Sequence, residues 1–140
     1  MLSAREASFV KAVGKSDSYL VSSMLTRGLI DVNFHSPRTE GFTGLHYASQ
    51  EGDDSMVDVL LRHGAAIDTR TGLGLTAIML AANRGHAAIV TKLLDAGADA
   101  DLQEPTLGAS ALMMAAYGGH TSVVHRLVAS GADEDLVGIS

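Results

Sequence analysis

The sequence predicts an all-α repeat protein, a solenoid of about four helix-turn-helix units joined by hairpin-like turns. Two observations support this prediction. A segment of seven residues that begins at Thr43 returns at Thr76 and again at Ser110, at offsets of 33 and 34 residues. The composition is 46% hydrophobic but only 4% aromatic, which favours close packing of small and aliphatic helix residues over an aromatic-rich β-sandwich.

The chain of 140 residues has the length of a single domain. We therefore expect a single domain over residues 1–140, with turns near 31–42, 66–75 and 99–109 and a last turn at 133–140. The units are expected at about 4–35, 36–68, 69–101 and 102–135. Whether the chain is a fragment of a longer protein stays open.

Each unit carries start and stop signals for two helices. Thr43, Thr76 and Ser110 precede apolar stretches, so their hydroxyls are predicted to cap the first helices. The second helices place apolar residues at positions i, i+1, i+4 and i+5, and each ends before a glycine that is predicted to adopt a left-handed conformation. These glycines are Gly28, Gly64, Gly97 and Gly131.

The two end units differ from the inner ones. In the first unit Phe9, Ala12, Val21 and Met24 occupy the expected apolar positions, although the rest of the unit diverges. The last helix carries the same apolar set as an inner unit, and no polar capping repeat follows it in this sequence. Terminal repeats normally need a polar outer face, so this end is expected to be partly exposed or covered by a partner.

These residues resemble the ankyrin repeat, whose pattern runs from a capping Thr through L-H-x-A-A and an apolar helix to L-L-x-x-G-A-D. The resemblance covers about three full repeats from Gly41 to Asp135 and a divergent first unit. The family's proline after the capping residue is replaced by Gly44, Ala77 and Ala111. The resemblance implies a non-enzymatic module that binds another protein in a concave groove.

By the same resemblance, positions that the repeat pattern leaves free line the concave side. The candidate partner-binding residues are Phe42, Tyr47, Gln50, Leu75, Leu80, Asn83, Met114 and Tyr117. Several are apolar, and contiguous exposed apolar surface usually marks an interaction site. Two alternatives stay open: Leu80 and Met114 pack between neighbouring first helices, or the protein is an assembly subunit that docks through its uncapped C-terminal repeat.

Motifs for catalysis or cofactors are weak. The absence of cysteine excludes disulfides, thiolate metal sites and cysteine nucleophiles. The G-x-G-x-x-A match at residues 72–77 occupies a repeat turn without a surrounding βαβ unit, which argues against dinucleotide binding. The histidines form no chelating pair, and His46 is interpreted as a hydrogen-bonding residue at a helix start. We therefore expect no catalytic residues, no metal and no cofactor.

Charge limits the partners. Sixteen acidic against ten basic residues give a net charge of −6, which disfavours nucleic acid and anionic membranes. Acids at the turns, such as Asp68, Asp99 and Asp101, are expected to be solvated or to form an acidic edge for a basic partner.

The remaining expectations concern localisation, assembly and modification. No signal peptide or membrane-spanning run is found, so an intracellular protein, cytoplasmic or nuclear, is expected. It would bind an unknown protein partner as a monomer, or form a weak homodimer through the C-terminal repeat. Modification of Asn33 or Ser36 stays open.

Overall fold

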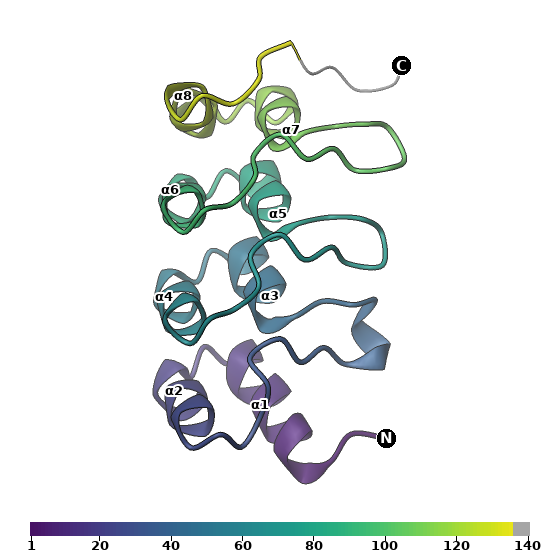
Figure 1. Ribbon diagram of the computed structural model, residues 1–140, viewed down its shortest axis with the longest axis vertical. Helices are drawn as coiled ribbons and strands as arrows, with labels where there is room; N and C mark the ends of the chain where they lie inside the picture. Colours follow the sequence, from purple (N-terminus) through teal and green to yellow (C-terminus); the bar gives the residue numbers. More distant parts are fainter. Residues whose placement is uncertain (136–140) are drawn as a thin grey trace.

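The computed structural model describes residues 1–135, and within them the fold is a stack of four helix pairs (Figure 1). The first helices of the pairs form one column and the second helices form another, while the connecting turns project to one side. The first helices are α1 (Ala4–Gly14), α3 (Gly44–Glu51), α5 (Ala77–Arg84) and α7 (Ala111–Tyr117). The second helices are α2 (Ser18–Thr26), α4 (Asp54–Arg62), α6 (Ala87–Asp95) and α8 (Thr121–Ala129).

The all-α repeat architecture is therefore confirmed. A short 3₁₀ helix, η1 (Pro37–Thr39), lies in the first long turn, where proline fixes the backbone angle needed to start it. None of the described helices is long and apolar enough to cross a membrane. The predicted last turn extends into residues 136–140, which lie outside the described residues.

Polar side chains fix most helix starts, largely as predicted. The Thr43 and Ser110 hydroxyls accept hydrogen bonds from the backbone N–H groups of His46 and Met113. Asp53 caps α4 in the same way, by accepting from the N–H of Met56 at 3.2 Å. The prediction for Thr76 is wrong in one respect: the residue occupies the N-cap position, but its buried hydroxyl makes no hydrogen bond among the described residues.

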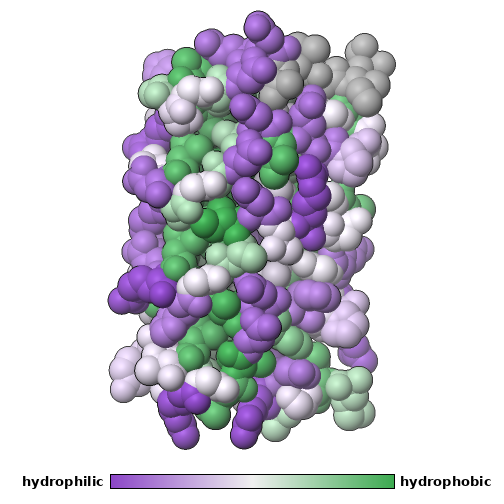
Figure 2. Space-filling view, in the orientation of Figure 1, coloured by the Kyte–Doolittle hydropathy of each residue, from purple (hydrophilic) through white to green (hydrophobic). Residues whose placement is uncertain are grey.

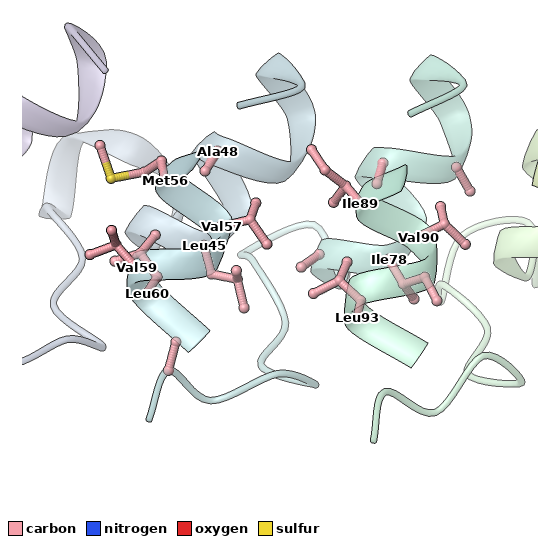
Figure 3. Close-up of a cluster of buried hydrophobic side chains, with 14 of the residues drawn as sticks. Leu45, Ala48, Met56, Val57, Val59, Leu60, Ile78, Ile89, Val90 and Leu93 are labelled. Carbon is pink, nitrogen blue, oxygen red and sulfur yellow. The ribbon is translucent and has the colours of Figure 1, made fainter. Parts of the chain in front are cut away.

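The hydrophobic core runs between the two columns along the whole stack (Figure 3). Leu60, Leu93 and Leu127, which occupy the same position in successive second helices, are completely buried. Ala48, Ala81 and Ala115 are buried on the first helices, where their small side chains let the columns approach closely. Figure 2 shows hydrophobic residues in a band along the long axis, so the surface follows the same periodicity.

The long turns are hairpin-like and braced. In the second turn the Thr71 N–H donates to the Leu75 carbonyl at 2.9 Å, and in the third the Glu104 N–H donates to the Ala109 carbonyl at 2.9 Å. Gly74 has φ +82°, and an added Cβ would lie 2.3 Å from Pro105 Cδ in the next turn. Glycine is therefore required there both by conformation and by close approach.

Neighbouring repeats are joined by a polar ladder at the turns. The side chains of Asn33, Asp68 and Asp101 each accept a hydrogen bond from a backbone N–H of the following repeat. The donors are the N–H groups of Ala66, Asp99 and Asp133, at 2.8, 3.1 and 2.8 Å. The two acids at the turns are thus not merely solvated, because they satisfy backbone donors between repeats.

Histidines make a second set of links between repeats. His86 Nε2 donates to the Gln50 carbonyl at 3.0 Å, and His120 Nε2 donates to the Asn83 carbonyl at 2.9 Å. Both bonds reach from the start of a second helix to the end of the first helix in the preceding repeat, from α6 to α3 and from α8 to α5. These two histidines therefore link neighbouring repeats.

His46 ties the first helix of its repeat to the second long turn. Its Nε2 donates to the Thr69 carbonyl at 2.7 Å, so its Nδ1 is the acceptor for the Thr43 N–H at 2.9 Å. This tautomer follows because a carbonyl oxygen can only accept. Burial lowers the pKa of His46 below its usual value, against the opposing effect of the Thr69 bond. The predicted role at the helix start is confirmed.

Substitution of Gly97 tests the prediction that left-handed glycines end the second helices. Its φ is +98°, and an added Cβ would meet no atom within 4 Å, so any cost of substitution comes from the backbone alone. Gly97→Val should lower the free energy of unfolding by more than about 1 kcal/mol, because a β-branched residue is strained in this region. Urea denaturation measures the change.

Gly14 provides the matched control for this substitution. It also has open space around an added Cβ, but its φ is not positive. Gly14→Ala should therefore leave stability unchanged or raise it. Equal stability of Gly97→Val and the wild type would contradict the assignment of Gly97 as a left-handed stop.

His46 should make stability depend on pH. Because its pKa is lower in the folded than in the unfolded chain, the unfolded chain binds the proton more readily as pH falls. The contribution of His46 is present above the unfolded pKa of about 6.5 and is lost as pH falls toward and through the folded value. Denaturation between about pH 8 and pH 5 should show this loss.

A variant comparison isolates His46 from the other histidines. His46→Gln should show a smaller fall in stability on acidification than the wild type, whereas His125→Gln, altered at an exposed position, should keep the wild-type fall. Identical pH profiles for His46→Gln and the wild type would contradict the assignment.

Candidate functional site

An apolar groove lies between α5 and α7 and the turns that precede these two helices. It has a volume of about 680 Å³, within the usual range of binding pockets. Its floor is made by Met79 and Leu80 of α5 and by Met113 and Met114 of α7. Methionine packs adaptably against different partners, so this floor suits an apolar ligand surface. We call this depression the α5/α7 groove.

One wall of the groove carries two exposed leucines at the turn tips. Leu73 is 61% exposed and Leu107 is 59% exposed, and both line the groove. Sequence analysis missed these residues, although a leucine flanked by Gly72 and Gly74, or beside Gly108, was a usable signal. A hydrophobic side chain at a glycine-bounded turn tip has no core to enter.

The opposite wall is polar and uncharged. Asn83 and Tyr117 line it, and both are exposed, Tyr117 to 84%. Between them and the leucines the groove offers an apolar floor with hydrogen-bonding groups along one side. Such an arrangement matches a segment with one apolar face and one polar face.

Among the groove-lining residues that the structure describes, Glu104 is the one charged residue, and its carboxylate is hydrogen-bonded within its own turn. Its carboxylate accepts hydrogen bonds from the N–H groups of Ala109, Leu107 and Thr106 at 3.1, 2.7 and 2.8 Å. The Ala109 bond, with the others, lowers the pKa of this carboxyl. Glu104 therefore rigidifies the turn and does not present a free charge to a ligand.

A smaller aromatic cavity of about 190 Å³ lies between α1, α3 and the first long turn. It is lined by Phe9, Phe34, Phe42 and Tyr47 among others. Phe42 and Tyr47 form an edge-to-face pair with centroids 6.1 Å apart, and Phe9 and Phe34 form another at 6.5 Å. The cavity is large enough for a side chain but not for a long segment.

The structure divides the predicted stripe between these two depressions. Phe42 and Tyr47 line the aromatic cavity, whereas Leu75, Leu80, Asn83, Met114 and Tyr117 line the α5/α7 groove. Gln50 lines neither of them, and its carbonyl accepts the hydrogen bond from His86.

Leu80 corrects the prediction of an exposed stripe. Only 7% of it is exposed, so it forms part of the groove floor and packs largely between the first helices. Met114 and Leu75 are half-buried and Tyr47 is 42% exposed. The difference arises because Leu80 lies on an inner helix flanked by α3 and α7, where neighbours cover it from both sides.

The described residues show no arrangement for metal binding. No group of three or more His, Asp or Glu residues that could hold a metal ion occurs in residues 1–135. Residues 72–77, which carry the G-x-G-x-x-A match, form a turn tip and the start of α5. This placement agrees with the interpretation of the match as a repeat turn.

The two residues considered for modification differ in accessibility. Asn33 is exposed, although its Oδ1 accepts from the Ala66 N–H. Ser36 is only 4% exposed, and its hydroxyl accepts from the Arg38 N–H. The folded chain therefore shields Ser36.

Comparison with known proteins identifies the repeat. The family described as "Ankyrin repeats (3 copies)" matches residues 9–104 and 45–137. Human ankyrin repeat and SOCS box protein 2 is 35% identical over 94 residues, which are 66% of this chain and 14% of that protein. The rice (Oryza sativa subsp. indica) potassium channel AKT1 is 41% identical over 75 residues, covering 54% of this chain and 8% of the channel.

A third relative, the chicken nuclear factor NF-kappa-B p105 subunit, is 32% identical over 96 residues, covering 66% of this chain and 10% of that protein. The aligned part is thus a small fraction of each of these relatives. The chain belongs to the ankyrin-repeat family.

Proposed function

We propose that this protein is a non-enzymatic interaction module that holds a segment of a partner protein in the α5/α7 groove. The observation that carries this proposal is the pair of exposed leucines, Leu73 and Leu107, standing over an apolar floor. Exposing such side chains to water is unfavourable, and their burial by a partner contributes to binding. Protein binding is also the general role of ankyrin repeats.

The groove favours a partner segment with an apolar face and without a charge at its contact surface. The Glu104 carboxylate already accepts three backbone hydrogen bonds within its own turn, and the groove lining that the structure describes offers no other charged side chain to pair with a cation on the partner. Desolvating an unpaired charge is costly. Asn83 and Tyr117 are placed to hydrogen-bond the polar side of the segment.

The walls of the groove are held rigid before binding. The Arg70 guanidinium donates to the carbonyls of Gly74 and Gln103, at 2.8 and 3.0 Å, and so joins the second turn to the third. The Gly72 N–H donates to the Glu40 carbonyl at 2.6 Å and joins the second turn to the first. A preorganised groove loses little conformational entropy when a partner binds.

The proposal predicts that substitutions at the turn tips weaken binding without unfolding the protein. A partner is first identified by cross-linking in source cells, and its affinity is then measured by calorimetry with purified protein. Leu107→Ser and Tyr117→Ala should each weaken binding at least tenfold, since buried anchors contribute about 2 kcal/mol or more. Thermal unfolding should move little, because both residues are exposed.

Two further variants complete this experiment. Tyr19→Ala removes a residue that is 86% exposed on α2, away from the groove, and should leave affinity unchanged. Leu93→Ala removes a completely buried side chain and should cost about 2–5 kcal/mol of stability. Unchanged affinity in Leu107→Ser and Tyr117→Ala would show that the partner uses another surface.

The aromatic cavity is tested separately with Phe42→Ala and Tyr47→Ala. If the partner also reaches α3, each substitution should weaken binding at least tenfold with little change in the thermal midpoint. Unfolding as severe as that of Leu93→Ala would instead show that these two residues belong to the core.

A further inference from the structure

The interface between successive repeats has two halves that recur along the chain. On each inner second helix one side chain points to the preceding repeat and its neighbour points to the following repeat. Met56 and Ile89 point backwards, and Val57 and Val90 point forwards (Figure 3). All four are at most 1% exposed, so both halves are fully covered inside the stack.

Within residues 1–135, the forward half of the last repeat is partly exposed. Val124 corresponds to Val57 and Val90 but is only half-buried. Ala116 is exposed, whereas Ala82, at the same position of the preceding repeat, is completely buried. Val128, one turn after Val124, is 37% exposed. The sequence prediction of a partly exposed end is therefore confirmed for the described residues.

Within residues 1–135, the backward half of the first repeat is also partly exposed. Leu20 of α2 occupies the position of Met56, Ile89 and Val123, each of which is at most 1% exposed. Leu20 itself is 41% exposed. The two ends of one chain therefore carry the two halves of the interface that its inner repeats form.

Within the described residues, the polar ladder leaves one group without a partner at each end: a carboxylate acceptor in the last repeat and a backbone N–H donor in the first. Its acceptors Asp68 and Asp101 lie four residues after the terminal glycine of a helix pair, and Asp135 holds that position in the last repeat. The Asp135 carboxylate has no partner among the described residues. The donors Ala66, Asp99 and Asp133 each lie two residues before the acceptor position of their own repeat. The corresponding residue before Asn33 is Asp31, whose N–H makes no hydrogen bond within residues 1–135.

Charge favours the same pairing of ends. Residues 1–35 hold four basic and three acidic residues, a net charge of +1, whereas residues 102–135 hold one basic and four acidic residues, a net charge of −3. Three of these acids, Asp133, Glu134 and Asp135, are consecutive and exposed at the C-terminal end. Opposite charges would attract the two ends, and like charges oppose contact between two C-terminal ends.

We propose that the C-terminal face of the solenoid binds the N-terminal repeat of a second copy of this chain, head to tail. In this arrangement Leu20 of the second copy packs against Val124 and Val128, and its Asp31 N–H donates to Asp135. The contact is heterologous, so it adds copies along one direction and does not close as a dimer. It leaves the α5/α7 groove unoccupied.

Sedimentation equilibrium of the full chain tests this association. A single stacking contact is smaller than a standard interface, so concentrations from ~10 µM to ~1 mM are needed. The weight-average mass should rise steadily through and beyond that of a dimer, and should fall as salt is raised. A constant monomer mass over this range, or a plateau at the dimer mass, would overturn the proposal.

Variants of the two faces identify the contact. Leu20→Glu and Val128→Glu, each at a partly exposed position, should each remain monomeric. Mixed in equal amounts, they should form a dimer and nothing larger, because one intact head meets one intact tail. Self-association of Leu20→Glu alone would instead show contact between two C-terminal ends and would contradict the head-to-tail arrangement.

Matched controls separate this effect from added charge and from groove binding. Tyr19→Glu and Ser122→Glu place the same charge on the same helices at exposed positions and should associate as the wild type does. Leu107→Ser, altered in the groove, should also associate normally. Loss of association in either charge control would show a general effect of charge and would overturn the assigned faces.

Discussion

The structure depends on the stacking of helix pairs that cannot bury their apolar sides alone. A pair of helices of seven to eleven residues is too short to be stable in water by itself. Each pair gains its stability by covering one side of the next pair, through the buried positions of Met56 and Val57 and their equivalents. The repeat of 33 or 34 residues follows from this constraint, because every unit must present the same two halves.

Stacking also explains why polar groups are distributed as they are. The hydrophobic interface fixes the distance between repeats but leaves backbone donors at the turns without partners in their own repeat. Asn33, Asp68 and Asp101 satisfy these donors across the boundary, while His86 and His120 satisfy carbonyls at the ends of first helices. Each of these bonds needs its donor and acceptor within hydrogen-bonding distance across the repeat boundary, so together they favour one register of stacking over others.

Periodicity made the fold predictable, because packing between repeats sets the residues at the repeated positions. Helix starts at Thr43 and Ser110 and the left-handed Gly28, Gly64, Gly97 and Gly131 all follow from local chemistry that acts within one turn of chain. Thr76 departs, because the Met79 sulfur accepts from its backbone N–H at 3.4 Å while its hydroxyl makes no hydrogen bond among the described residues. Met113 stands at the same position after Ser110, whose hydroxyl does cap its helix, so the residue type at that position does not predict the difference.

The candidate site was less predictable because it depends on distances between turns of different repeats. Leu73 and Leu107 lie in turns whose positions are set by Arg70, Glu104 and the contact of Gly74 with Pro105. No residue within one turn indicates that the two leucines stand on one wall. Burial of Leu80 likewise results from two neighbouring helices at once, which a sequence pattern within one repeat does not contain.

Stability and recognition depend on different residues in this fold. Positions such as Leu60, Leu93 and Leu127 are common to the repeats and completely buried, so changing them alters every unit's packing. The groove is built instead from residues at the turn tips and on the first helices, such as Leu73 and Leu107, which lie outside the repeated core positions. Within residues 1–135, packing positions in the first and last repeats are partly exposed, as Leu20 and Val128 show. An end of a solenoid is therefore a place where a residue selected for stability gains the properties of a residue for binding.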